Sequence, residues 1–190
     1  MTRIETDRLI LRPYVERDAA RGLDIHSRLE VIRWLSNPPF VPMADLDEAR
    51  AWIGNWATVP DRGPYDLGLA IEVRETGVMV GTVMVVPLPN AENDERQVGW
   101  HLHPDSVGLG YATEAATALR DWLFRETAWD HFIGIAARRN TAPLAVLGRL
   151  GMLPPPPAWA LAIASQVPRP NRPHPPCPQR APHPRPAAPR

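Results

Sequence analysis

The residues best suited to chemistry lie within residues 97–115, where a strand pattern runs through a glycine-bearing loop into a helix pattern. The apolar strand pattern ends at His103, the loop contains Gly108 and Gly110, and strong helix formers follow. The first N–H groups of a helix have no intrahelical acceptor, and with the helix dipole they favour a bound phosphate. Glycine lets the loop backbone approach such an anion closely or adopt positive φ. This segment therefore predicts a site for a phosphate-bearing cofactor.

Two histidines on the same strand pattern, His101 and His103, are candidates for proton transfer or metal binding. An unperturbed histidine titrates near neutrality, so His101 is a candidate general base, although a solvated position at the rim of a cleft is the favoured interpretation. A metal site needs a third ligand and no His or Cys cluster supplies one, so we expect no metal. Glu72 is a second possible base, and a solvent-facing position is again the favoured interpretation.

The composition is that of a globular protein, with 44% hydrophobic residues, 22% charged residues and a formal net charge of zero. A chain of 190 residues is long enough for one domain with a core, but nothing in the sequence indicates an oligomeric state. The N-terminus has no apolar signal segment and no apolar run could span a bilayer, so we expect no membrane partner. Cys177 is the only cysteine, which rules out an internal disulfide and fits the cytoplasm, where we expect the protein.

Hydrophobic periodicity predicts an α/β protein in which strand and helix patterns follow one another along the chain. Strands are expected at residues 4–12, 65–73, 78–86, 96–103 and 131–137, and helices at 18–34, 45–58, 110–126 and 143–150. The strands on either side of Glu75-Thr76-Gly77 should form a hairpin. The tryptophans in the helical segments could line a substrate pocket, but helical spacing favours core packing for them: Trp34, Trp52 and Trp56.

The composition changes at Pro154, which opens a run of four prolines. Residues 154–190 are rich in Pro, Arg and Ala and contain no acidic residue, and their prolines cannot donate to a sheet ladder. We therefore expect a folded domain over residues 1–153 and a disordered tail over 154–190, with a brief ordered turn near Trp159 and Leu161. Because the tail arginines are separated by prolines without interleaved aromatics, nucleic acid is not an expected partner.

Four passages in order resemble the GNAT superfamily of acyl-CoA-dependent N-acyltransferases, and most closely its branch of ribosomal-protein N-terminal acetyltransferases. They are residues 5–13 (ETDRLILRP), 80–82 (VGT), 98–104 (VGWHLHP) running into 108–115 (GLGYATEA), and 140–142 (NTA) running into 147–152 (LGRLGM). The resemblance covers about residues 3–153.

That resemblance implies a mixed, mostly antiparallel, twisted sheet flanked by helices, splayed between strands 96–103 and 131–137 to form the cofactor cleft. It implies acetyl-CoA as co-substrate, no metal, and a primary amine as acceptor, either a protein N-terminus or a small amine. The cofactor would contact strand, loop and helix residues: Trp100, His101, Leu102, Gly108, Leu109, Gly110, Tyr111, Ala112, Thr113 and Asn140. The amine would attack directly, with a strand N–H polarising the acetyl carbonyl and no covalent intermediate, because the domain contains no cysteine.

Two departures from the family pattern bear on function. Val107 stands where a phosphate-binding Arg or Gln is common, so the loop amides must bind the diphosphate without it. The family continues after Met152 with two further strands, whereas this chain continues with polyproline, which predicts a sheet that lacks its last two strands. The alternative function is therefore a non-catalytic or inactive GNAT-like protein, truncated or frameshifted at its C-terminus. A nucleotide-phosphate binder is a third class, against which the lack of any lysine and of a P-loop motif speaks.

Overall fold

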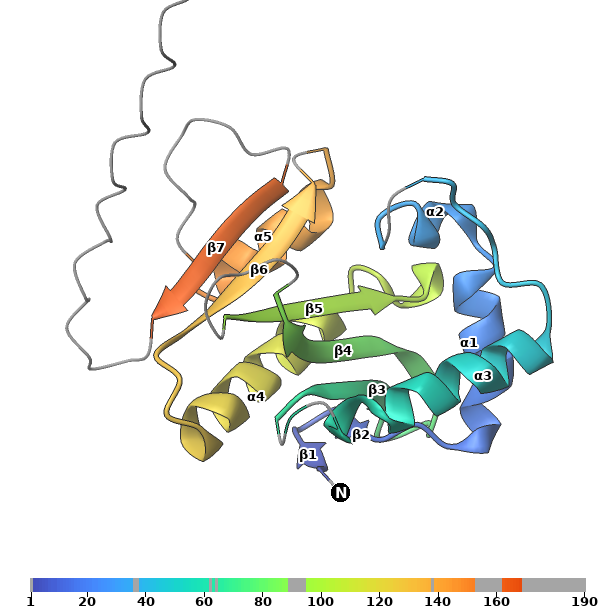
Figure 1. Cartoon of the computed structure of the whole chain (residues 1–190), viewed down its shortest axis with the longest axis horizontal. Coiled ribbons are helices and arrows are strands. Elements are labelled where there is room, and N and C mark those ends of the chain that lie inside the picture. The colour runs from blue at the N-terminus through green and yellow to red at the C-terminus, as the bar shows by residue number, and fades with distance from the viewer. Residues whose placement is uncertain are drawn as a thin grey trace, which may run out of the picture.

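The computed structural model describes residues 2–35, 38–61, 63, 65–88, 95–137, 139–152 and 162–168, and these residues build a seven-stranded mixed sheet (Figure 1). In sheet order, which is also chain order, the strands are β1 Ile4–Glu5, β2 Leu9–Arg12, β3 Leu67–Val73, β4 Met79–Pro87, β5 Arg96–Leu102, β6 His131–Ala137 and β7 Ala162–Pro168. All neighbours pair antiparallel except β5 and β6, which are parallel. The predicted α/β class and mostly antiparallel sheet are confirmed.

The N-terminal strand predicted over residues 4–12 is two short strands, because the chain turns back at Thr6. The Thr6 backbone N–H donates to the Leu9 carbonyl at 3.0 Å, and the Leu9 N–H donates to the Thr6 hydroxyl at 2.9 Å. A threonine side chain that bonds the backbone in this way stabilises a turn in place of a continuous strand. β1 and β2 then pair in the register Ile4↔Leu11.

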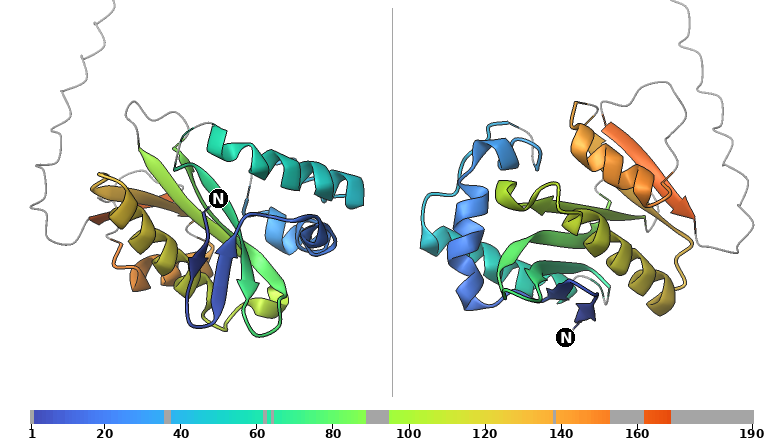
Figure 2. Two further views of the ribbon diagram at one scale, coloured as in Figure 1. Left: turned by 90° about the horizontal axis from the view of Figure 1, so that it is seen from below. Right: turned by 180° about the vertical axis from the view of Figure 1, so that it is seen from behind.

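Helices cover both faces of the sheet (Figure 2). One face carries α1 Ala19–His26, α2 Leu29–Ile32 and α3 Leu46–Ala57, and the other carries α4 Tyr111–Glu126 and α5 Thr141–Arg149. The main core lies under α4 and α5, where Leu119 and Leu123 pack against the strands, and a smaller core containing Ile25 lies under α1. The single helix predicted over residues 18–34 is divided, since α1 ends at His26 and α2 begins at Leu29.

α3 lies close to β3 because Gly68 leaves room for a tryptophan ring. A Cβ on Gly68 would lie 1.8 Å from Cε3 of Trp56, which is far inside van der Waals contact. The ring of Trp52 stands edge-on to Tyr14 at 4.9 Å between centroids, and Trp56 stacks on Tyr14 at 6.5 Å. Trp52 and Trp56 thus pack against Tyr14 as helical spacing predicted, although both are only half-buried, whereas Trp34 is 38% exposed.

A buried ion network joins the first strands to the start of α1. The Arg12 guanidinium forms ion pairs with the carboxylates of Asp18 and Glu72, at nitrogen–oxygen distances of 2.7 Å and 2.6 Å. Glu72 is only 7% exposed. The expectation that Glu72 faces solvent is therefore wrong, because a carboxylate 60 residues from Arg12 in sequence is brought against it by β2–β3 pairing. Its charge is satisfied by Arg12 and Arg17, so Glu72 is a structural residue and not a free base.

The parallel strands β5 and β6 pair over a short distance only. Their register consists of Gln97↔Ile133 and Val98↔Gly134, although each strand is seven residues long. Beyond these pairs the two strands diverge toward their carboxyl ends, as Figure 1 shows. The predicted splay of the sheet at this position is confirmed.

The sheet continues beyond β6 into the segment that was expected to be a disordered tail. β7 pairs antiparallel with β6 from His131↔Pro168 to Ala137↔Ala162. The prediction that the sheet lacks its last two strands is therefore wrong for one strand. Residues 158–167 contain no proline, so this stretch can donate to a ladder where its flanks cannot. Residues 153–161, which include Trp159 and Leu161, and residues 169–190 lie outside the described part of the chain.

Candidate active site

The loop between β5 and α4 has the backbone geometry of an anion site. Gly108 and Gly110 have φ of 87° and 83°, the left-handed region that favours glycine. Gly110 is also the N-cap of α4, and its carbonyl accepts the first helical hydrogen bond from the Glu114 backbone N–H. No side chain forms a capping hydrogen bond at this end of the helix. The N–H groups of residues 111–113 therefore have no intrahelical acceptor, and they point out of the positive end of a 16-residue helix. Such N–H groups could hold an anionic group such as a diphosphate.

The edge of β5 next to this loop is open on one side. Because pairing with β6 ends at Val98, the backbone groups of residues 99–102 that point away from β4 are left for another extended chain. Trp100 and Leu102 pack against the core under α4, so His101 lies on the opposite face of the strand. The structure thus offers both parts that a pantetheine diphosphate needs, an open strand edge and an anion cradle at its end.

Asn140 lies at the same end of the sheet as the glycine loop. It immediately precedes α5, its backbone N–H donates to the Ala137 carbonyl at 2.8 Å, and its side chain makes no capping bond. Because β5 and β6 run parallel, the loops that follow their carboxyl ends meet at one edge. The predicted cofactor residues, from Trp100 to Leu102, from Gly108 to Thr113, and Asn140, therefore surround the divergence of the two strands.

His101 belongs to a line of polar side chains between the sheet and the helices α1 and α3. Its Nε2 lies 3.0 Å from the hydroxyl of Thr82, and that hydroxyl lies 2.6 Å from the hydroxyl of Tyr14. The ring of His26 stands edge-on to the ring of His101 at 4.9 Å between centroids. Nδ1 of His26 lies 2.9 Å from the Gly22 carbonyl.

Both of these histidines are neutral at physiological pH. Burial and, to a smaller extent, the neighbouring His26 together lower the pKa of His101 to about 3. Burial also lowers the pKa of His26, although the Gly22 carbonyl opposes this effect. A neutral imidazole can accept a proton from one side and donate from the other, which a histidinium cannot.

His103, the second histidine of the strand pattern, has a structural position. It lies just beyond β5 and is buried, with Nε2 at 3.0 Å from an Asp24 carboxylate oxygen. Its Nδ1 accepts a bond from the Asp105 backbone N–H at 3.1 Å. These contacts tie the start of the glycine loop to α1. Within the described residues no group of three or more His, Cys, Asp or Glu side chains could hold a metal ion.

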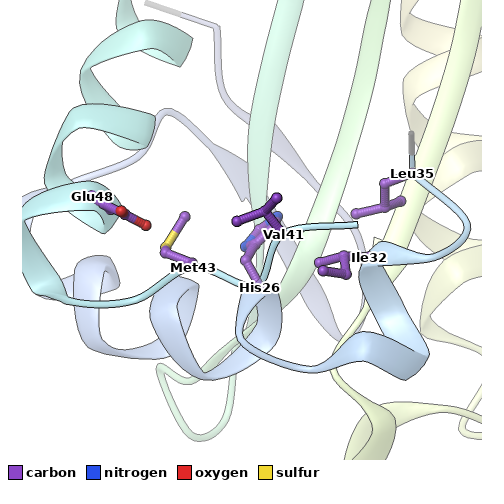
Figure 3. Close-up of a pocket in the computed structure, with 6 residues that line it drawn as sticks. All are labelled: His26, Ile32, Leu35, Val41, Met43 and Glu48. Atoms are coloured by element: carbon purple, nitrogen blue, oxygen red, sulfur yellow. The ribbon is translucent and has the colours of Figure 1, made fainter. Parts of the chain in front are cut away.

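A cavity of about 260 Å³ lies beside His26 (Figure 3). Its lining comes from the ends of α1 and α2, the segment leading into α3, and α3 itself: His26, Ile32, Leu35, Val41, Met43 and Glu48. Glu48 lies at one end of the view in Figure 3, and His26 stands in the middle among apolar side chains. One wall of the cavity is thus the residue that contacts the ring of His101.

The sequence model of the acetyltransferase (GNAT) domain matches residues 8–153. The chain belongs to the GNAT acetyltransferase family. It is an N-acetyltransferase that uses acetyl-CoA, the acyl donor of that family. The family match ends where the proline-rich segment begins, so β7 lies beyond it.

Individual proteins resemble this chain in sequence or in fold. The uncharacterized protein YkkB of Bacillus subtilis is 29% identical over 154 residues, which are 80% of this chain and 85% of YkkB. An acetyltransferase from Agrobacterium tumefaciens has the same fold, with a TM-score of 0.73 and 24% identity over 89% of this chain and 95% of its own. RimJ of Mycobacterium smegmatis, solved in complex with CoA-disulfide, has a TM-score of 0.69 and 19% identity over 84% of this chain and 81% of its own.

Some residues of this candidate site could not be predicted from the sequence. Thr82 and Tyr14 complete the polar line to His101, and His26 joins it to the cavity. A threonine within the apolar pattern of β4 is the one local signal, since its side chain is buried. Among the described residues no helix has the length and apolarity needed to cross a membrane.

Proposed function

We propose that this GNAT enzyme acetylates a primary amine whose apolar substituent occupies the cavity beside His26. The observation that carries this proposal is the position of His26, which lines the cavity and also contacts the His101 ring beside the open edge of β5. An amine held in the cavity would therefore have its nitrogen directed toward the thioester end of the cofactor site.

The cofactor roles follow the order of the predicted residues along the chain. The backbone of Trp100, His101 and Leu102 would bind the pantetheine arm as an added strand. The N–H groups from Gly108 to Thr113 would bind the diphosphate, and the side-chain amide of Asn140 would bond an amide of the pantetheine. When bound, acetyl-CoA supplies an acetyl group activated as a thioester.

The proposed reaction is a direct transfer. The amine nitrogen forms a bond to the acetyl carbonyl carbon, the carbon–sulfur bond breaks, and the proton lost by nitrogen balances the leaving thiolate as CoA thiol. A backbone N–H of β5 would stabilise the developing oxyanion. Neutral His101 would accept the amine proton once the attacking nitrogen carries positive charge, and the hydroxyls of Thr82 and Tyr14 hold its ring in place.

The lining of the cavity favours a monoamine or a hydrophobic N-terminal residue over a polycation. Ile32, Leu35, Val41 and Met43 are apolar, and Glu48 is the one carboxylate among the six lining residues. A polyamine would bury further ammonium groups without partners, which is strongly unfavourable. The choice between a small amine and a protein N-terminus depends on what extends beyond the cavity.

A non-catalytic protein is not favoured. The family match extends over residues 8–153, which include the strand, loop and helix of the proposed cofactor site, and β7 supplies a strand that the sequence analysis did not predict. The proline-rich segment therefore does not by itself indicate an inactive chain.

Release of CoA thiol tests the proposal when the full chain is given acetyl-CoA and a panel of acceptors. The panel comprises linear alkylamines of increasing length, spermidine, and short peptides with Leu or Asp at the N-terminus. We expect turnover to increase with alkyl length and to favour Leu over Asp. A preference for spermidine would contradict the apolar acceptor, and no turnover with a chain that binds acetyl-CoA would contradict acyl transfer to these amines.

A further inference from the structure

A clamp from the turn between β1 and β2 holds the glycine loop from outside. Arg8 Nη1 donates to the Leu109 carbonyl at 3.0 Å, and its Nε donates to a Glu114 carboxylate oxygen at 2.7 Å. The Thr6 hydroxyl donates to the other Glu114 oxygen at 2.6 Å, which also accepts the Arg8 backbone N–H at 3.1 Å. The guanidinium lies over the Tyr111 ring at 5.0 Å. Arg8 therefore touches the loop, the first turn of α4 and the aromatic ring at the helix start.

The bond to Leu109 fixes the direction of one N–H group. In a planar trans peptide the carbonyl and the following N–H point in opposite directions. Because Arg8 holds the Leu109 carbonyl on its own side, the N–H of Gly110 must point to the other side, away from the guanidinium. Without this bond, a loop that contains two glycines could adopt many backbone conformations. The bond selects the conformation in which the Gly110 N–H faces an anion.

Arg8 also neutralises the carboxylate of Glu114, which lies close to the N–H groups of the glycine loop. Glu114 lies in the first turn of α4, where an uncompensated negative charge would repel a diphosphate. Burial alone would raise the pKa of the Glu114 carboxyl, but the bonds from Thr6 and Arg8 outweigh burial and lower that pKa. The ion pair with Arg8, at 2.6 Å, balances the resulting charge. Val107 leaves the loop itself without a cation.

We propose that Arg8 is a positioning residue for the diphosphate of acetyl-CoA, acting through the orientation of the Leu109–Gly110 peptide and through neutralisation of Glu114. This inference rests on the proposed cofactor site. Val107 has no charge and cannot bind a phosphate as an arginine at that position would. Arg8, in the turn between β1 and β2, supplies this part of phosphate recognition instead. Glu114 and Thr6 orient the guanidinium and do not touch the cofactor.

Titration calorimetry of the full chain with two probes tests the role of Arg8. Acetyl-CoA carries the diphosphate, and S-acetylpantetheine has the same acyl-pantetheine arm without any phosphate. We expect Arg8→Gln to weaken acetyl-CoA binding about tenfold, as for loss of a charge-assisted contact. Binding of S-acetylpantetheine should change by less than about twofold, because that probe does not use the loop. Arg3→Gln is the matched control, since Arg3 is 52% and Arg8 51% exposed and both make ion pairs with a glutamate.

Two further variants separate the two actions of Arg8. The double variant Arg8→Gln/Glu114→Gln should bind acetyl-CoA more tightly than Arg8→Gln, because it no longer carries the unbalanced carboxylate. It should still bind more weakly than the wild type, because the Leu109–Gly110 peptide is no longer oriented by Arg8. Arg8→Lys retains the cation without the planar fork, so it should lie between wild type and Arg8→Gln, and it keeps the test decisive if Arg8→Gln does not fold. An Arg8→Gln or Arg8→Lys protein with wild-type affinity for acetyl-CoA, or with equal losses for both probes, would overturn the inference alone. A wild-type chain that binds neither probe would overturn the proposed function and this inference with it.

Discussion

His101 combines a proposed catalytic role with a strongly lowered pKa, and this combination determines how it could act. A histidine with a pKa of about 3 cannot take a proton from an alkylammonium ion in solution and keep it. It can take the proton from nitrogen that has already attacked the carbonyl, since that nitrogen is far more acidic, and pass it on at once. The histidine then serves as a relay, and the free amine must be supplied by the acceptor's own ionisation.

Replacing His101 tests the relay. We predict that His101→Ala lowers kcat about 100-fold while leaving acetyl-CoA affinity close to that of the wild type. The acid limb of the pH–rate profile should keep its midpoint, because it reports the acceptor amine and not His101. His131→Ala, a change at a partly exposed histidine of β6, is the control. Rates of CoA release between pH 6 and 9 provide the measurement, and an acid limb that disappears in His101→Ala would contradict the relay.

The two buried histidines also make folding stability depend on pH. The folded-state pKa values of His26 and His101 lie below the ordinary value, so the unfolded chain binds more protons below about pH 6.5. The free energy of unfolding should therefore fall as pH decreases from 7 to 5, by up to about 1.4 kcal/mol per pH unit for each histidine. Urea denaturation at several pH values measures this slope, and His101→Gln should reduce it. A constant free energy of unfolding over this range would be inconsistent with buried neutral histidines.

At the scale of elements, the packing of α3 on β3 depends on one glycine. Gly68→Ala places a Cβ 1.8 Å from a Trp56 ring atom, so the ring or the helix must move. We predict a loss of about 1–3 kcal/mol in the free energy of unfolding, as for other overpacked sites. Gly54→Ala is the control, because outside its chain neighbours and the adjacent backbone of α3 no atom lies within 4 Å of its Cβ position, and it should stabilise by about 0.5–1 kcal/mol. Urea denaturation of the two variants tests this, and equal stabilities would show that α3 packs differently.

Local patterns predicted the elements around the proposed cofactor site. Gly108 and Gly110 indicated positive φ, and the run after them indicated α4, because both signals depend on a few consecutive residues. The splay of β5 and β6 came from the family resemblance and not from periodicity. The sequence could not predict the line from Tyr14 through Thr82 to His101, because neighbouring members are 68 and 19 positions apart. Thr82 meets His101 only through the register of β4 and β5.

The predictions that the structure overturns have different physical origins. The alternation of side chains along β3 places Glu72 on one face of that strand. That Arg12 lies against the same face is determined only by the pairing of β3 with β2. The first strand was predicted as continuous because the Thr6 side-chain bond that turns the chain is a local contact without an apolar signature. β7 was missed because its proline-free stretch is short and lies within a segment whose overall composition indicates disorder.

At the scale of the whole molecule, β7 should protect an otherwise open sheet edge. Its seven-residue ladder covers β6, and an uncovered strand of this kind favours aggregation. We predict that a chain ending at residue 152 unfolds at a lower temperature than one ending at residue 168 and scatters more light on heating. A loss of about 1 kcal/mol would lower Tm by roughly 2–4 °C in a chain of this size. Equal Tm values for the two chains would show that β7 does not stabilise the domain.

The central claim, that the glycine loop binds the diphosphate of acetyl-CoA, is tested most directly by thermal unfolding of three proteins with and without acetyl-CoA. They are the wild type, Gly108→Glu and Gly77→Glu. Gly108 and Gly77 have positive φ, 87° and 67°, and neither has an atom within 4 Å of its Cβ position apart from its chain neighbours, so the two changes strain the fold alike. Only Gly108→Glu places a carboxylate in the loop.

Acetyl-CoA at about 100 times its Kd should stabilise the wild type and Gly77→Glu by about 2.7 kcal/mol, seen as a rise in Tm of several degrees. The Tm of Gly108→Glu should not rise. A shift in Gly108→Glu equal to that of Gly77→Glu, or no shift in the wild type, would contradict the claim.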